Sequence, residues 1–310
     1  MLPEKFGCFV HLVAFCGLAH GYLVVEYPKS ELLKPPASLV SVETKLGTAI
    51  GYRQPVRNHT INVFYGLPYA EPPTGKLRFK KSRPIARFPE NPYPALSFKP
   101  HCYLPYDKFN PSDKFDEDCL YLNMWTPDLE ASKVNGVCRK KYAVIIYLFG
   151  FDNSIFRMSP FSRWDDKRHL YNAELIPTFE TIFIILNYRQ RLFSSFYLHE
   201  AYPGNLLLFD QNLALQWTRQ HIDAFCGDTE RLTLNGQSHG AFATELHLIS
   251  KISNRLFSTA IVQSSPGFFK VGGDFDALAS NLNLCAAFHA QGLRTNHSKR
   301  DDGQLLPDDR

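Results

Sequence analysis

Apolar residues in the second half of the chain form short unbroken runs instead of alternating with polar ones. The runs cover residues 142–148 (YAVIIYL), 181–186 (TIFIIL), 232–235 (LTLN) and 259–263 (TAIVQ). Unbroken runs of this length are typical of strands that are covered on both faces, as in a parallel sheet. The pattern therefore predicts four buried parallel strands.

Helix-like segments lie between these runs. Residues 210–225 offer an apolar face made of Leu213, Leu215, Trp217, Ile222 and Phe225. Asp210 is placed to cap the start of this helix, and residues 240–252 form a second helix candidate directly after the third run. The alternation of strands and helices predicts an α/β fold, with a mostly parallel central sheet flanked by helices.

The first hundred residues have a different pattern. Apolar residues alternate over residues 39–52, which also contain Gly47 and Gly51, and this indicates a short hairpin. Residues 62–78 are rich in turn-forming residues, and Pro68, Pro72, Pro73 and Gly75 exclude a helix there. This part of the chain is therefore expected to consist of strands and turns.

Composition and charge narrow the function classes. The chain has 310 residues, of which 45% are hydrophobic and 21% charged, and its net charge is +4. This is an ordinary globular balance, and the mild charge gives no reason to expect a nucleic-acid partner. No apolar run reaches the roughly 18 to 20 residues of a membrane span, so no span is predicted beyond the first segment. No cofactor and no metal site is predicted.

The N-terminus indicates secretion. Residues 6–25 are mostly apolar, Lys5 precedes them, and small residues stand before a possible cut at Tyr22. We interpret residues 1–21 as a signal peptide, with a buried helix or an uncleaved anchor as the alternative. Two sequons, at Asn58 and Asn296, fit a glycosylated extracellular protein. Cleavage would remove two of the seven cysteines and leave an odd number.

One short motif carries chemistry. Gly236-Gln237-Ser238-His239-Gly240 has the form G-x-S-x-G and lies between an apolar run and a helix candidate. A nucleophile elbow belongs at such a place, because its glycines permit the sharp turn that lifts the serine above the sheet. Ser238 is therefore the candidate nucleophile. The alternative is an inert serine in an ordinary strand–turn–helix connection.

Several longer blocks carry a resemblance to a known family. The blocks, in chain order, are 64–73 (FYGLPYAEPP), 77–79 (LRF), 117–123 (EDCLYLN), 187–189 (NYR), 204–217 (GNLLLFDQNLALQW) and 261–264 (IVQS). Together with the elbow they resemble the type-B carboxylesterase/cholinesterase family of α/β-hydrolases. The resemblance implies a partial domain of this fold over residues 22–285, truncated after the strand that follows the elbow. Residues 286–310 are polar and are expected to form a disordered tail.

The resemblance also implies roles for single residues. Cys102 and Cys119 stand in the positions of the family's first disulfide, and Arg78 and Glu117 stand where members form a buried ion pair. Phe109 occupies the register of an aromatic residue that binds choline in some members, which makes it a weak candidate for substrate binding.

The chain departs from the family at the chemical positions. Members have a glycine-rich oxyanion segment, but this oxyanion region consists of Gly150, Phe151 and Asp152, with His239 after the serine. An Asp carboxylate would repel a developing oxyanion, and the loss of one oxyanion donor costs about 10²–10³ in rate. The family's acid and histidine follow the serine at long distance. Since 310 − 238 = 72 residues follow Ser238, we expect both to be missing.

Three functional hypotheses stay open at this point. The first is a secreted serine esterase in which Ser238 attacks a small ester. The second is a catalytically impaired member that binds an extracellular protein partner or a small ester ligand. The third is a fragment without independent function. The matching scaffold and the altered chemical residues favour an impaired protein over an active enzyme.

Overall fold

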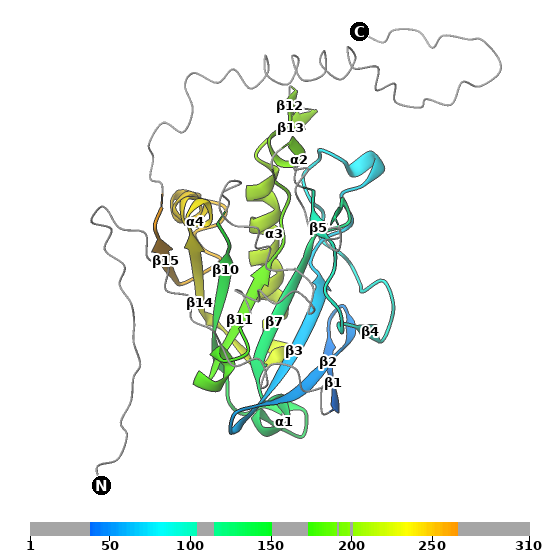
Figure 1. Cartoon of the computed structure of the whole chain (residues 1–310), viewed down its shortest axis with the longest axis vertical. Helices are drawn as coiled ribbons and strands as arrows, with labels where there is room; N and C mark the ends of the chain where they lie inside the picture. Colours follow the sequence, from blue (N-terminus) through cyan, green and yellow to red (C-terminus); the bar gives the residue numbers. More distant parts are fainter. Residues whose placement is uncertain (1–37, 104–114, 151–172, 191, 199–200, 266–310) are drawn as a thin grey trace, which may run out of the picture. The chain divides into compact units, whose positions relative to one another are not determined.

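A single sheet organises the chain (Figure 1). The computed structural model describes residues 38–103, 115–150, 173–190, 192–198 and 201–265. The sheet has nine strands in the order β1-β2-β3-β7-β11-β10-β14-β15, and β4 pairs with β2. The strands are β1 (Ser38–Thr44), β2 (Gly47–Val56), β3 (His59–Pro68), β4 (Tyr93–Pro94), β7 (Tyr121–Pro127), β10 (Tyr142–Leu148), β11 (Thr181–Leu186), β14 (Gly227–Gln237) and β15 (Thr259–Gln263).

The sheet consists of a parallel half and an antiparallel half. Strands β11, β10, β14 and β15 are parallel neighbours, which confirms the four strands predicted from the apolar runs. Strands β1, β2, β3, β7 and β11 pair antiparallel. The α/β fold class is confirmed, while the antiparallel half makes the sheet more mixed than the apolar runs alone predict.

The N-terminal hairpin was predicted from alternation, and it forms. Strand β1 pairs with β2 along the whole length of β1, and the burial of β1 alternates because one of its faces is open to solvent. Gly47 begins β2 at a φ of 122°, a conformation that L side chains rarely adopt. Residues 62–68 belong to β3, so the turn-rich region begins later than expected. It contains the short 3₁₀ helix η1 (Gly75–Leu77).

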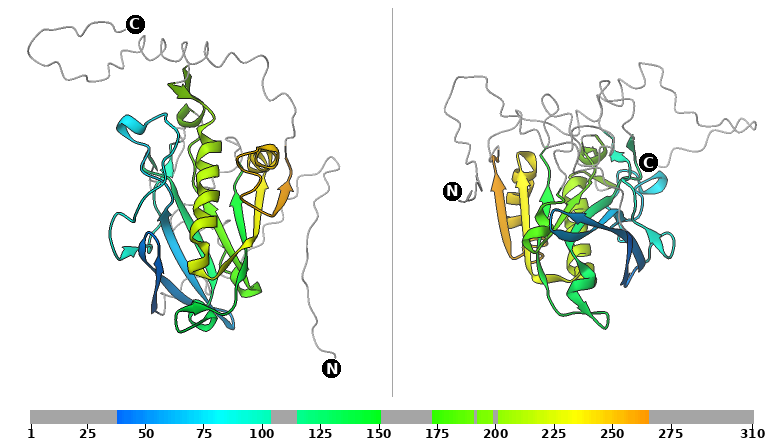
Figure 2. Two further views of the ribbon diagram at one scale, coloured as in Figure 1. Left: turned by 180° about the vertical axis from the view of Figure 1, so that it is seen from behind. Right: turned by 60° about the horizontal axis from the view of Figure 1, so that its bottom comes forward.

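Two helices accompany the sheet. Helix α3 (Leu206–His221) runs along the sheet, and α4 (His239–Ile249) packs against β14, β15 and β10 (Figure 2). The shorter helices are α1 (Leu129–Ser132), η2 (Ile176–Phe179), α2 (Leu192–Ser195) and η3 (Ile222–Phe225). Helix α3 begins four residues before Asp210, with Asn205 as its N-cap residue. The predicted cap at Asp210 is therefore wrong, and Asp210 instead pairs with Arg189 inside the protein.

Two disulfides join elements that are distant in sequence. Cys102 in β5 (His101–Cys102) is bonded to Cys119, the pair that the resemblance implied. Cys138 in β9 (Val137–Cys138) is bonded to Cys226, which directly precedes β14. The second bond was not predicted, and it ties residues that are 88 positions apart. β5 pairs with β6 (Phe115–Asp116), β9 with β8 (Lys133–Val134), and β12 (Tyr197–Leu198) with β13 (Tyr202–Pro203).

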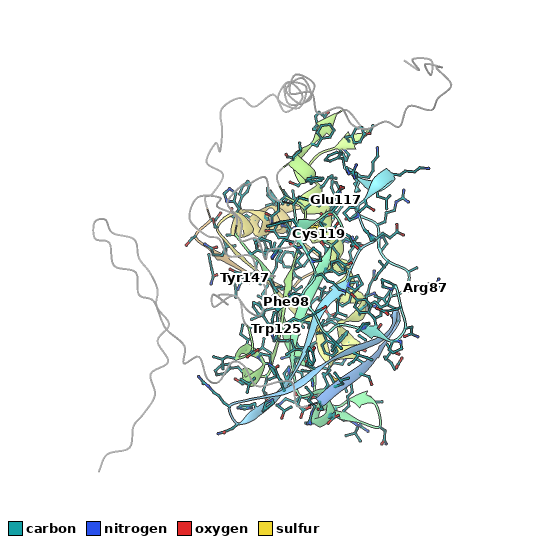
Figure 3. The ribbon with its side chains drawn as sticks, turned by 45° about the vertical axis from the view of Figure 1, so that its right-hand side comes forward. Arg87, Phe98, Glu117, Cys119, Trp125 and Tyr147 are labelled. Atoms are coloured by element: carbon teal, nitrogen blue, oxygen red, sulfur yellow. A yellow bond between two sulfur atoms is a disulfide. The ribbon has the colours of Figure 1, made fainter. Side chains whose placement is uncertain are left out.

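The sequence blocks that carry the family resemblance meet in space. The backbone N–H of Gly66 donates to the side-chain carbonyl of Asn123 at 2.8 Å, and the Tyr69 hydroxyl donates to the backbone carbonyl of Asn187 at 2.6 Å. The Asn187 amide in turn donates to the backbone carbonyl of Cys119 at 3.0 Å. Cys119 is labelled in Figure 3 beside Glu117. These blocks therefore hold strands β3, β7 and β11 together.

Candidate active site

Ser238 lies at a sharp turn between β14 and α4. Its backbone has a φ of 55° and a ψ of −124°, which is strained for a residue with a side chain. Its N–H donates to the carbonyl of Gln263 in β15 at 2.9 Å, so the neighbouring strand fixes the turn. This strand–turn–helix geometry is that of a nucleophile elbow.

The two glycines of the motif allow the elbow to close. A Cβ placed on Gly236 would lie 2.1 Å from the carbonyl oxygen of Gly240. A Cβ placed on Gly240 would lie 2.1 Å from the carbonyl oxygen of Leu148, the last residue of β10. Real Cβ atoms do not approach backbone so closely, so only glycine fits at either position without a shift of the backbone.

The oxyanion region begins in contact with the elbow. A Cβ on Gly150 would lie 2.6 Å from the Cβ of Ser238 and 2.5 Å from the carbonyl oxygen of Gln237. The preceding residue, Phe149, stacks on Tyr188, whose hydroxyl donates to the Phe149 carbonyl at 2.6 Å. Gly150 and Ser238, which are 88 residues apart in sequence, are therefore brought together at the end of β10. Phe151 and Asp152 lie outside the described residues.

None of the described side chains forms a hydrogen bond with the Ser238 hydroxyl. His239 is the first residue of α4 and is exposed. His247 follows Ser238 by nine residues on the same helix, a rise of about 13.5 Å, which is beyond hydrogen-bond reach. It is 2% exposed, and its Nε2 donates to the Oε1 of Gln211 at 3.0 Å. Burial lowers the pKa of His247 from 6.5 to about 4, so it is neutral at pH 7.

The remaining candidate residues are scaffold or lie outside the described ranges. Arg78 and Glu117 form an ion pair at 2.5 Å, but the Arg78 side chain is 46% exposed, so the pair is half exposed instead of buried. Asn58 is exposed in the turn between β2 and β3, where a glycan would find room. Phe109 and Asn296 lie outside the described residues, as do the segments interpreted as signal peptide and polar tail.

One buried ion pair, between Arg189 and Asp210, was not predicted from the sequence. Arg189 donates from Nη2 and Nε to the two carboxylate oxygens of Asp210, at 2.7 and 2.8 Å. Both residues stand in blocks that carry the resemblance, but Arg189 was given no role and Asp210 only that of a helix cap. Arg189 and Asp210 carry opposite charges in otherwise apolar surroundings. This could have revealed the ion pair, because a buried charge needs a partner.

The described residues contain neither a cluster of metal ligands nor a membrane-spanning helix. No group of three or more histidine, cysteine, aspartate or glutamate side chains there could hold a metal ion. No helix among the same residues is long and apolar enough to cross a membrane.

Several known proteins are similar to this chain in sequence. The chain is similar to a cholinesterase of Mus musculus, with 33% identity over 236 residues that cover 72% of this chain and 36% of the relative. It is also similar to an acetylcholinesterase of Danio rerio, with 34% identity, 72% of this chain and 35% of the relative. An acetylcholinesterase-1 of Trittame loki is 30% identical over 92% of this chain and 48% of its own length.

The chain thus spans between about a third and a half of the length of the curated relatives that it matches. The sequence profile of the carboxylesterase family matches residues 38–288, which is most of the chain and includes the elbow, Gly150 and both disulfides. The chain therefore belongs to the carboxylesterase family.

Proposed function

We propose that this chain is a secreted, non-hydrolytic member of the carboxylesterase family that acts by binding a small ester ligand or an extracellular protein. The observation that carries the proposal is the contact between Gly150 and Ser238. Because Gly150 touches the elbow, the residues that follow it in the chain are those from which oxyanion donors would come. Here they are Phe151 and Asp152, in place of the family's glycines.

The second observation that supports the proposal is that no described histidine is placed to activate Ser238. A serine hydroxyl is a weak nucleophile unless a nearby base accepts its proton. Among the described histidines, His247 is too distant and already donates to Gln211, and His239 is exposed on the first turn of α4. The elbow therefore keeps its shape, but no histidine of the described residues is placed to activate Ser238, and the oxyanion segment is not glycine-rich.

Secretion is supported by the cysteine chemistry. Four of the described cysteines are paired in the two disulfides Cys102–Cys119 and Cys138–Cys226. Disulfides persist in oxidising compartments and are rare in the cytosol. The apolar segment of residues 6–25 and the exposed sequon at Asn58 agree with an exported, glycosylated protein.

A second candidate function is ester hydrolysis by Ser238. The strained backbone at Ser238 favours it, because such strain is kept where the surrounding structure fixes it and is frequent at catalytic residues. The names of the similar proteins, cholinesterase and acetylcholinesterase, describe hydrolases. In this chain the altered oxyanion segment opposes that activity.

A fluorophosphonate probe separates the two functions, because it labels only an activated serine. We would treat the secreted full chain with the probe and follow Ser238 by mass spectrometry, with Ser238→Ala as control. We expect no labelling of the folded protein. Labelling that disappears in Ser238→Ala would overturn the proposal and establish an esterase.

A second variant, in which the glycines of the oxyanion segment are restored, shows which part of the site is impaired. Phe151→Gly combined with Asp152→Gly restores the glycine-rich segment and leaves Ser238 untouched. If only the oxyanion segment is impaired, this variant becomes labelled while the wild type stays unlabelled. If neither is labelled, the serine also lacks its base, as proposed.

A further inference from the structure

The segment after β3 concentrates positive charge. Residues 76–83 read KLRFKKSR, so five of eight side chains are basic, whereas the whole chain has a net charge of only +4. The segment is the cyan loop at the upper right of Figure 1, beginning within η1. Lys76, Arg78, Lys81 and Arg83 are exposed. This density of basic residues is typical of patches that bind polyanions such as heparin or nucleic acid.

Two hydrogen bonds from other parts of the chain fix the backbone of residues 76–83. Arg189, which is buried by its pair with Asp210, donates from Nη1 to the carbonyl of Lys80 at 2.8 Å. The carbonyl of Arg83 accepts a hydrogen bond from the N–H of Glu71 at 2.8 Å. The charges are therefore presented on an ordered backbone, which lowers the entropy lost on binding.

Ring–ring and cation–π contacts hold the side chains of the same segment in place. Phe79 stacks on Phe193 and packs against Phe196, with ring centroids 5.6 and 4.7 Å apart. The ammonium groups of Lys80 and Lys81 lie 4.1 and 4.3 Å from the ring centroids of Tyr202 and Phe209. These rings are occupied with one another and with the lysines, so they act as a support for the charges.

Most of these charges have no counter-ion among the residues that the structure describes. Arg78 pairs with Glu117, but within the described part of the chain no carboxylate forms an ion pair with Lys76, Lys81 or Arg83. Lys80 donates to the carbonyl of Ala201, which is neutral. Lys76, Lys81 and Arg83 are therefore exposed cations without a counter-ion among the described residues, and Lys80 is half-buried beside them.

We propose that residues 76–83 form a binding site for a linear sulfated polysaccharide, with Lys76, Lys81 and Arg83 as the groups that bind sulfates. Charge complementarity supports this class of partner, because fixed guanidinium and ammonium groups form strong charge-assisted hydrogen bonds with such oxyanions. A single nucleic-acid strand would need free rings for its bases, and a membrane would need protruding apolar side chains. The rings beside this segment are packed against one another. The site is independent of Ser238.

The test uses the full secreted chain and heparin as the probe. We would measure the affinity for heparin in solution and the salt concentration that elutes the protein from immobilised heparin. The test variant combines Lys76→Ala, Lys81→Ala and Arg83→Ala, and it leaves Lys80 and Arg78 with their contacts. The control variant combines Arg139→Ala, Lys251→Ala and Arg255→Ala, which removes the same charge at exposed positions of other elements.

We expect the wild type and the control to bind heparin at about 0.15 M salt, within twofold of each other, and the test variant to bind at least tenfold more weakly. Desulfated heparin should not bind. Failure of the wild type to bind, or an equal loss in both variants, would overturn the proposal. Tighter binding to duplex DNA or to vesicles of anionic lipid than to heparin would also overturn it, in favour of that partner.

Discussion

The guanidinium of Arg189 and the carboxylate of Asp210 form a bidentate ion pair inside the protein, and their side chains are 3% and 0% exposed. The backbone N–H of Arg189 also donates to the same carboxylate, at 3.1 Å. Because Arg189 follows β11 and Asp210 lies in α3, the pair fixes the helix to the end of the strand. It also supports the basic segment through the Lys80 carbonyl.

Asp210→Asn should lower the free energy of unfolding by about 3–5 kcal/mol, because it leaves the Arg189 charge buried without its counter-ion. Urea unfolding followed by circular dichroism measures this change. The matched control is Glu117→Gln, which breaks the half-exposed pair with Arg78 and should cost less than about 1 kcal/mol. Equal costs for the two variants would contradict a special role for the buried pair.

Loss of the Cys138–Cys226 bond should destabilise the chain more than loss of Cys102–Cys119. The two bonds close loops of 88 and 17 residues, which correspond to about 4.6 and 3 kcal/mol of chain entropy in the unfolded state. Thermal unfolding of the two paired Cys→Ala variants compares them. A larger loss for the short loop would show that the folded state, and not loop length, dominates.

Cys226 allows a finer test of backbone strain. Its φ is 59°, a left-handed conformation that costs a residue with a Cβ about 1–2 kcal/mol. In a Cys138→Ala background, Cys226→Gly should therefore be more stable than Cys226→Ala by about 1 kcal/mol. The two double variants differ by one methyl group, and urea unfolding of both gives the difference directly. Equal stability would mean that the backbone relaxes.

Gly240→Ala tests the packing of the elbow. Helix propensity alone predicts that alanine stabilises this position in α4 by about 1 kcal/mol. The contact between the added Cβ and the Leu148 carbonyl predicts the opposite, a loss of about 1–3 kcal/mol. Gly136→Ala is the control, because nothing lies within 4 Å of its added Cβ and only its positive φ of 76° opposes the change.

Stability should fall as the pH decreases from about 6.5 to 4. Burial lowers the pKa of both His247 and His101 from 6.5 to about 4, so the folded chain holds them neutral. The unfolded chain binds more protons in this window, and protonation therefore favours unfolding by roughly 2–3 kcal/mol per histidine near pH 4. Unfolding of His247→Gln and the wild type across this range should show a smaller pH dependence for the variant.

Much of the parallel half of the sheet could be predicted from the sequence, because strands that are buried on both faces have unbroken apolar runs. Strand β7 was not predicted, since it contains Asn123 and Thr126, which are polar yet fully buried. The side-chain carbonyl of Asn123 accepts a hydrogen bond from the N–H of Gly66, a residue 57 positions away. Because the partner is so distant in sequence, the residues around Asn123 show no local pattern that predicts a buried strand.

The candidate site was predictable to a similar extent. The motif around Ser238 indicated the elbow because its glycines and its place between strand and helix are local features. The contact with Gly150 could be expected only through the family resemblance, since it depends on how β10 and β14 pair. The pairing of Cys138 with Cys226 was out of reach, because cysteine order does not determine connectivity.

The Cys138–Cys226 bond also determines how the chain responds to a protease. It encloses residues 139–225, which include β10, β11 and α3. A single cut anywhere in this stretch leaves both fragments on one covalent molecule. Nicked protein would therefore migrate as an intact chain on a non-reducing gel and separate into two bands only after reduction.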